Sequence, residues 1–439
     1  MLAALGNTWA LMFGIFLLQV GNGIQGTALG IRGALEGFDA TTMGYVMSGY
    51  FVGFFGGAHV TPILLRRVGH VRVFAALASL ISAAFILYAA AVSPAAWLLM
   101  RLLCGFCFSG VYVVAESWLN NQSDNNTRGQ TLSAYLICQM VGIIVAQALV
   151  PLTDPAGYDL FVIMSVAVSI ACAPILLSAS PTPFFETSRQ LPLRTLFKIS
   201  PLGAAGMIAS GAIFASMFGM TAVYGTEKGL SITEISIVMG AFYLGAALLQ
   251  FPIGWISDRM DRRRLIAMVT ATGMLACLMM SVVGDGFVGI ALAAVLVGGI
   301  ANPLYSLLVA HTNDFMERED MAAAAGGLVL LNGIGAAGTP VLVGYLLQAF
   351  GPEAFPLFMA VIFAALCAYA FYRMTVRPAT PVEETLPYAP VAPAATQASY
   401  EAAQEYYAEQ ADALADEQAE QEAAAEAAAE APVPERTPA

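Results

Sequence analysis

The sequence predicts an all-α membrane protein in which twelve transmembrane helices form two pseudo-symmetric six-helix halves. Three observations support this prediction: an apolar composition, basic residues that alternate between successive loops, and an internal repeat. Of the 439 residues, 59% are hydrophobic and only 11% are charged. A soluble domain is about 45–50% apolar and about 25% charged. A soluble enzyme is therefore close to excluded, and the lipid bilayer is the expected solvent.

The predicted spans are runs of mostly apolar residues, of which a membrane-crossing helix needs about 20. Polar or Gly/Pro clusters divide the chain into twelve such runs. Their limits are 8–30, 42–65, 73–93, 95–119, 129–150, 158–178, 201–225, 233–256, 265–284, 286–310, 322–349 and 354–376. We expect the first run to be a span rather than a cleaved signal peptide, because no basic segment precedes it.

The basic residues concentrate in alternate loops. Fourteen of the 18 Arg and Lys residues fall on one side of the predicted membrane, which we call the basic side. Only Arg32 and Lys228 fall in the loops of the opposite side, which we call the far side. Short loops rich in Lys and Arg stay in the cytoplasm. This pattern predicts that both termini are cytoplasmic. We further expect the protein to lie in a bacterial inner membrane.

An internal repeat relates the two halves of the chain. It matches Met47, Gly53, Arg67 and Arg72 with Met239, Gly245, Arg259 and Arg264 at an offset of 192, and Gly105 with Gly299 at an offset of 194. Repeats of this kind are typical of secondary transporters. We therefore predict an N-terminal half over residues 1–178, a cytoplasmic linker over 179–200 and a C-terminal half over 201–377.

The remaining residues, 378–439, form an acidic tail rich in Pro, Ala and Glu. This tail holds 13 acidic residues and one basic residue, so it accounts for the whole net charge of −12. The charge of the membrane part gives no reason to expect a nucleic-acid partner. The tail has no apolar stripe to bury, and its composition predicts a disordered or partly helical segment. A regulatory or partner-binding role for the tail stays open.

The most specific motif is GWISDRMDRRR over residues 254–264, between the eighth and ninth spans. It resembles the G-x-x-x-D-R-x-G-R-R loop of the major facilitator superfamily, with Asp261 where the family usually has Gly. The first-half counterpart, PILLRRVGHVR over residues 62–72, has Arg66 where an acid is expected. The resemblance implies gating positions at Arg66, Arg67, Gly69, Gly254, Asp258, Arg259 and Arg263. We expect Asp258 and Arg259 to form a breakable ion-pair latch, and residues 262–264 chiefly to fix topology.

Two ionisable residues lie within the fourth span. Arg101 begins a string that resembles the R-x-x-x-G element of the same superfamily, and a lone Arg inside a span is costly unless it faces a cavity or a partner. We expect Arg101 to act on substrate charge or protons, or alternatively to make a structural pair. Glu116, near the basic side and Arg128, has three interpretations: part of the inner gate, a proton carrier, or a surface ion pair.

Residues 30–32, 66–70 and 116–120 together resemble the YcaD-like branch of the superfamily. The general resemblance covers about residues 5–377, and it implies a transporter with a central cavity. Polar side chains inside the spans should point inward, either to line that cavity or to join helices. The candidates for the cavity are Gln19, Asn22, Gln25, Arg101, Tyr112, Gln139, Thr221, Tyr224, Asn302, Tyr305 and Asn332.

The sequence thus predicts a secondary transporter that moves a small, polar solute by alternating access, either as a facilitator or coupled to protons through Glu116. The alternatives are a drug or metabolite efflux antiporter and a non-transporting membrane receptor or scaffold. A membrane-embedded enzyme would need catalytic motifs that the chain lacks. The six cysteines lie in apolar segments, and we expect no metal or other cofactor. The expected partners are a small-molecule substrate, membrane lipid and, if coupled, protons; the expected state is a monomer.

Overall fold

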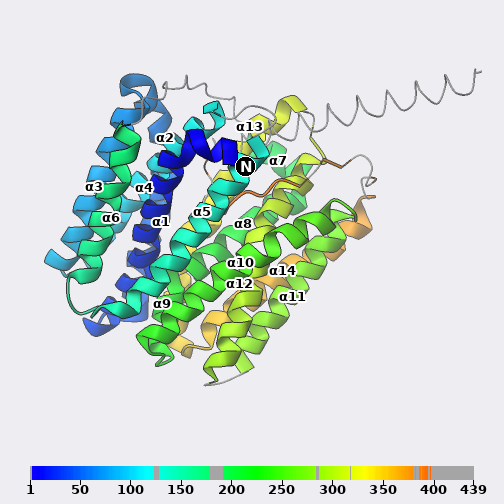
Figure 1. Cartoon of the computed structure of the whole chain (residues 1–439). Helices are drawn as coiled ribbons and strands as arrows, with labels where there is room; N and C mark the ends of the chain where they lie inside the picture. Colours follow the sequence, from blue (N-terminus) through cyan, green and yellow to red (C-terminus); the bar gives the residue numbers. More distant parts are fainter. Residues whose placement is uncertain are drawn as a thin grey trace, which may run out of the picture.

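The computed structural model is a bundle of long helices whose early members lie on one flank and late members on the other (Figure 1). The described residues are 2–122, 128–177, 191–282, 286–316, 318–378, 381, 385, 386, 388–393 and 396. Within the helices, the side chains left undescribed are those of residues 2–8, 120–122, 128, 129, 132, 176, 177, 318, 319 and 322. Most of the predicted linker and most of the acidic tail therefore lie outside the described residues.

Six helices make up the first flank, shown from blue to green-cyan in Figure 1. They are α1 (Leu2–Leu35), α2 (Ala40–Val68), α3 (His70–Ala90), α4 (Pro94–Gln122), α5 (Arg128–Leu149) and α6 (Asp159–Leu177). A 3-10 turn, η1 (Val150–Leu152), extends α5. Asp39 begins α2 by accepting a hydrogen bond from the Thr42 backbone N–H, which is the usual N-cap contact.

The second flank begins with the short helix α7 (Leu193–Ile199) and continues with six membrane-length segments. The first of these is interrupted: a π-helical turn, η2 (Ser216–Met220), joins α8 (Pro201–Ala215) to α9 (Thr221–Glu227). The others are α10 (Ile232–Ser257), α11 (Arg262–Val282), α12 (Phe287–Asn313), α13 (Arg318–Phe350) and α14 (Ala354–Val376). Ser231 and Glu234 form a reciprocal capping box at the start of α10.

Within the described residues, nine helical segments are long and apolar enough to cross a membrane, with Pro201–Glu227 as one segment. α6 adds a shorter apolar helix, Asp159–Ile175. The long helices α1 and α2 complete the twelve; α1 carries Gln19, Asn22 and Gln25 within its apolar run, which lowers its mean hydropathy. The prediction of an all-α membrane fold is confirmed, while the exact domain boundaries stay a prediction.

The outer surface of the bundle is apolar. On α10, for example, Leu244, Leu248, Phe251 and Trp255 form one exposed stripe at helical spacing. Contiguous apolar faces of this kind are rare on soluble monomers and are expected where lipid tails surround the helices. The chain is accordingly an integral membrane protein.

The internal repeat corresponds to equivalent helix packing in the two flanks. A Cβ atom on Gly53 of α2 would lie 2.0 Å from the Leu102 carbonyl of α4, and one on Gly245 of α10 would lie 1.9 Å from the Val295 carbonyl of α12. These small residues let the paired backbones touch. Gly105 of α4 lies against the Tyr50 carbonyl of α2, and Gly298 of α12 lies in the same way against the Phe242 carbonyl of α10. The structural counterpart of Gly105 is therefore Gly298, whereas the sequence repeat paired Gly105 with Gly299.

The two flanks meet closely at the far side. There, α2 packs along α13, and α1 packs against α9. The Ser48 hydroxyl donates to the Ala337 carbonyl, and the Thr41 hydroxyl donates to the Gln348 side-chain oxygen. At Gly344 the helices approach so closely that a Cβ atom would lie 2.4 Å from the Ala40 carbonyl. The far side of the bundle is therefore closed by backbone-close packing.

This closure predicts that Gly344→Val destabilises the protein. A valine there would push against the Ala40 carbonyl, so we expect the free energy of unfolding to fall by about 1–3 kcal/mol, as overpacking usually costs. Gly338→Val on the same helix is the matched control, because a Cβ there meets nothing within 4 Å. Equal thermal unfolding midpoints for the two variants would contradict the close approach of α2 and α13.

Candidate transport pathway

A cavity of about 310 Å³ lies in the middle of the bundle, between the two flanks. Its wall takes Gln19, Asn22 and Gln139 from the first flank and Asn302 and Asn332 from the second. It extends toward the basic side, where Pro62, Ile63 and Arg66 near the end of α2 also line it. Its volume is in the range of small-molecule binding sites.

A hydrogen-bonded network holds the first-flank wall of this cavity together. Gln19 donates to Gln139 Oε1 at 3.1 Å and accepts from the Tyr112 hydroxyl at 2.6 Å. Asn22 donates to the hydroxyls of Tyr50 at 3.2 Å and Tyr112 at 3.1 Å. The network joins α1, α2, α4 and α5, so one set of buried amides and phenols both positions four helices and presents polar atoms to the cavity.

Aromatic rings close the cavity toward the far side. Phe218, in the π-helical turn η2, lies 5.6 Å from Tyr50 and 6.4 Å from Phe51 between ring centroids. Phe214 stacks on Phe218 at 5.8 Å. All four rings line the cavity. These four rings were not predicted from the sequence, because aromatic residues at helical spacing are typical of an ordinary hydrophobic core. A π-helical turn, however, often marks a functional position.

Arg101 lies beside this wall but is not part of it. Its side chain is fully buried, its Nη2 donates to the Met47 sulfur at 3.1 Å, and its guanidinium carbon lies 4.8 Å from the centre of the Tyr50 ring. Its Nε and Nη1 atoms have no hydrogen-bond partner within the part of the chain that the structure describes. Arg101 therefore contacts the cavity indirectly, through the cavity-lining Tyr50.

Six of the eleven predicted cavity residues line the cavity: Gln19, Asn22, Tyr112, Gln139, Asn302 and Asn332. Gln25 instead donates to the Tyr88 hydroxyl at 2.8 Å inside the first flank. Thr221 donates to the Met217 carbonyl at 2.6 Å, and Tyr224 stacks on Phe355. Tyr305 and Arg101 are buried outside the cavity wall. These five residues therefore lie outside the cavity wall in this structure.

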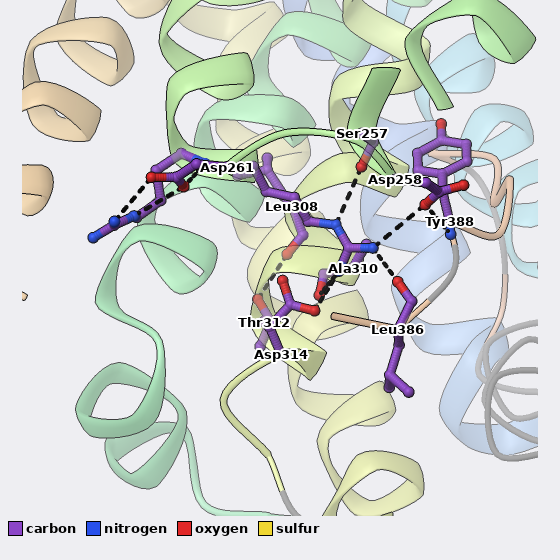
Figure 2. Close-up of polar contacts among 11 residues, drawn as sticks. Ser257, Asp258, Asp261, Leu308, Ala310, Thr312, Asp314, Leu386 and Tyr388 are labelled. Atoms are coloured by element: carbon purple, nitrogen blue, oxygen red, sulfur yellow. Dashed lines mark hydrogen bonds and ion pairs between the residues drawn. The ribbon is translucent and has the colours of Figure 1, made fainter. Parts of the chain in front are cut away.

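The motif at the basic end of α10 is organised around Arg262 (Figure 2). Its guanidinium forms an ion pair with Asp314, donates to the Ser257 hydroxyl at 3.1 Å and to the Ala310 carbonyl at 3.3 Å, and lies 3.6 Å from Asp258. Arg262 is thus the centre of the network, although the sequence suggested mainly a topological role for it. Asp314, just after α12, was not predicted, because nothing near it in sequence marks it as a partner.

The predicted latch partners Asp258 and Arg259 do not share a hydrogen bond. Arg259 lies over the Trp255 ring at 4.1 Å and donates to the Trp255 carbonyl. Asp258 ends α10 and accepts a hydrogen bond from the Tyr388 backbone N–H at 2.7 Å. Burial raises the pKa of Asp258 above its ordinary value, against the opposing effects of that bond and of Arg262.

The remaining motif positions differ in their surroundings. Arg263 pairs with Asp261 at 2.9 Å, and Gly254 lies against the Tyr388 ring. In the first-half counterpart, Arg66 lines the cavity and Arg67 is exposed. Gly69 joins α2 to α3 with φ +83°, a conformation that favours glycine.

Glu116 lies at the basic end of the cavity region and is buried. It accepts a hydrogen bond from the Tyr135 hydroxyl at 3.0 Å. The gate interpretation of Glu116 fits this place better than a surface ion pair does, because the carboxylate is only 3% exposed. Arg128 begins α5, and its side chain lies outside the described residues.

The bundle and its central cavity define a membrane transporter of the secondary type. The profile of the Major Facilitator Superfamily matches residues 11–231 and, in a second match, residues 202–403. The chain therefore belongs to this superfamily.

Within the superfamily, the chain is similar to YcaD-like MFS-type transporters. An uncharacterized MFS-type transporter of Enterobacter sp. (strain 638) is 24% identical over 372 residues, which cover 84% of this chain and 95% of the relative. The YcaD MFS-type transporter of Escherichia coli (strain K12) is 24% identical over 348 residues, which cover 77% of this chain and 88% of that protein.

Solved structures show the same fold. The nucleoside transporter NupG has a TM-score of 0.69 at 16% identity, covering 84% of this chain and 99% of NupG. The fucose:proton symporter FucP of Escherichia coli has a TM-score of 0.54 at 15% identity, covering 84% of this chain and 99% of FucP.

The Arg262 network predicts a distinctive pH dependence. Burial raises the pKa of Asp314 to about 6, against the opposing charge of Arg262. Because this value is above that of the unfolded chain, the folded protein binds the proton more tightly. Lowering the pH from 7 to 4 should therefore stabilise wild type relative to Asp314→Asn, by up to about 3 kcal/mol in thermal or denaturant unfolding.

Asp261→Asn is the matched control, because we expect its stability relative to wild type to change with pH in the opposite direction. Burial alone would raise the pKa of Asp261, but hydrogen bonds and charge from Arg263 together lower it. The stabilisation by Asp261 is therefore complete at pH 7 and is lost as the pH falls below about 4. Parallel pH trends for the two variants would contradict this assignment.

Proposed function

We propose that this transporter moves a small polar solute through the central cavity by alternating access. The main support for this proposal is the central cavity, whose wall contains amide side chains from both flanks. The far side is closed by contacts between α2 and α13, and the cavity extends toward the basic side. With the basic side in the cytoplasm, as its arginines predict, this arrangement is the inward-facing state of a monomer in the inner membrane.

The unpaired atoms of the cavity wall favour a solute that carries hydrogen-bond donors. Among the residues that the structure describes, buried Asn22 Oδ1 in the first flank and Asn332 Oδ1 in the second have no hydrogen-bond partner. An unpaired buried acceptor costs about 1–3 kcal/mol, which a hydroxyl or amino group of a solute would recover. The surrounding Tyr and Phe rings would pack against a flat or ring-shaped body. A hydroxylated or amino-bearing ring compound fits both features.

We predict that Asn22→Ala and Asn332→Ala each weaken solute binding about tenfold or more. The ligand is found by thermal-shift screening of the purified protein, because a bound solute stabilises the folded state. The first compounds to test are nucleosides and sugars, given the fold shared with NupG and FucP. Thr272→Ala, exposed on α11, is the control and should bind as wild type does. Unchanged affinity in both Asn variants would contradict the cavity as the binding site.

Proton coupling, if present, is proposed to use Glu116. Its buried carboxylate accepts a hydrogen bond from Tyr135 and lies at the basic end of the cavity region. Glu116→Gln keeps the shape of the side chain but removes its charge. We expect this variant to lose the dependence of uptake on an imposed pH gradient while it keeps solute exchange in proteoliposomes. Gradient-driven uptake that stays at the wild-type level would instead identify the protein as a facilitator or place the proton elsewhere.

A further inference from the structure

A short stretch of the tail packs inside the membrane bundle. The described residues between Leu386 and Thr396 run across the basic end of the bundle, as the orange trace in Figure 1. Ala389, Val391 and Thr396 are only 2%, 3% and 0% exposed. This burial is unexpected for a tail whose composition predicts disorder.

The first residues of the stretch, Leu386 and Tyr388, contact the cluster formed by Arg262, Asp258 and Asp314 (Figure 2). The Leu386 carbonyl accepts a hydrogen bond from Arg262, and the Tyr388 N–H donates to Asp258 at 2.7 Å. The Tyr388 hydroxyl accepts from Gln250 Nε2 at 2.8 Å, and its ring lies where a side chain on Gly254 would be. The loop between α10 and α11 therefore holds a piece of the tail in place.

The middle of the stretch enters the cavity. The Ser306 hydroxyl lies 2.9 Å from both the backbone nitrogen and the carbonyl oxygen of Val391. Asn332 Nδ2 donates to the Pro393 carbonyl at 2.9 Å. Ala392 and Pro393 are themselves part of the cavity wall. The stretch therefore occupies space along the path from the cavity to the basic side.

The stretch ends on the opposite flank. The Thr396 N–H and hydroxyl both donate to Glu116 Oε2 on α4. The earlier contacts are with α10, α11, α12 and α13, so the described residues of this stretch contact both halves of the transporter. A segment lying between the halves prevents them from closing together on the basic side.

The sequence of the stretch suits this buried position. It carries no charged residue between positions 385 and 396, and prolines recur every third residue at 387, 390 and 393. Prolines favour the extended polyproline II helix with three residues per turn, which needs no internal hydrogen bonds. They also lack a backbone N–H, so fewer donors need a partner when the segment is buried. A pre-extended segment loses little conformational entropy when it enters a groove.

We propose that residues 386–396 are a built-in plug, which blocks the solute pathway on the basic side and holds the bundle open on that side until it is displaced. The plug is an extended, proline-rich segment that bridges Arg262 and Glu116. This inference rests on the proposed alternating access for its functional meaning. Its occupancy of the cavity, however, can be tested without any transported solute.

The first test is a disulfide between the plug and the cavity wall. In a chain whose six native cysteines are replaced, Ser306→Cys and Val391→Cys are combined and treated with copper phenanthroline. We expect most molecules to form the 306–391 link, detected by mass spectrometry after digestion. Ser306→Cys with Val433→Cys, farther along the same tail, is the control for random collision. Equal, low linking of both pairs would overturn the plug.

The second test measures access to the cavity. Chains that end at Thr385 lack the plug, whereas chains that end at Ser399 keep it and lose the rest of the acidic tail. Each carries Asn302→Cys in the cavity wall and is labelled with a polar maleimide in nanodiscs. We expect labelling to be about tenfold faster in the chain that ends at Thr385, because a protecting segment has been removed. Equal or slower labelling would overturn the proposal.

Size-exclusion profiles and unfolding midpoints establish that both shortened chains are folded before labelling is compared. The two proposals can fail separately. Faster labelling without solute uptake by any chain would count against the transport proposal alone. Uptake with unchanged labelling would count against the plug alone.

Discussion

Polar groups in a membrane interior must find partners inside the protein, because the hydrocarbon offers none. The structure meets this constraint by gathering the amides of α1 against the phenols and amides of α2, α4 and α5. Gln19 and Asn22 are thereby tied to Gln139, Tyr112 and Tyr50. The same network leaves Asn22 Oδ1, at the cavity wall, without a hydrogen-bond partner among the described residues. The packing of the first half and the chemistry offered to a solute therefore depend on one set of hydrogen bonds.

The two ends of the bundle are held by different kinds of interaction. At the far side, small residues bring backbones into contact, as at Gly344 against Ala40. At the basic side, the buried Arg262 is surrounded by Asp314, Asp258 and backbone carbonyls. Close apolar packing has no titratable group, whereas the charge network responds to pH and to whatever competes for its partners. A bundle that alternates needs at least one end whose contacts can be exchanged, and the basic end has that character.

Much of the fold could be predicted from the sequence, because lipid imposes a simple pattern of apolar runs and basic loops. Twelve membrane segments, their approximate limits and the repeat around Gly53 and Gly245 were all accessible in this way. Only part of the cavity wall was accessible, because a Gln or Asn inside a span must point inward, whereas most of the wall is aromatic or aliphatic. Whether such a residue meets a solute or another helix depends on its rotation about the helix axis. That is why Gln25, one turn from Asn22, bonds to Tyr88 instead.

Other features left no local signal in the sequence. The ring of Phe218 reaches the cavity through the π-helical turn, which no apolar periodicity reveals. The ion-pair partner of Arg262 is Asp314, which is 52 residues away in the sequence. Arg259, which was predicted to pair with Asp258, packs over the Trp255 ring. The tail was predicted to be disordered or partly helical because it has no apolar stripe, yet Tyr388 and Val391 contact α10 and α12.

The halves are closed at the far side and separated at the basic side around one cavity, and we propose that a solute reverses this arrangement. Double electron–electron resonance tests it directly, with spin labels at Thr41 and Gln348 on the far side and, separately, at Ile63 and Val329 on the basic side. When a solute that stabilises the protein is added, we expect a population in which the distance between the far-side labels is longer and the distance between the basic-side labels is shorter. Two distances that stay fixed, or that change in the same direction, would contradict it.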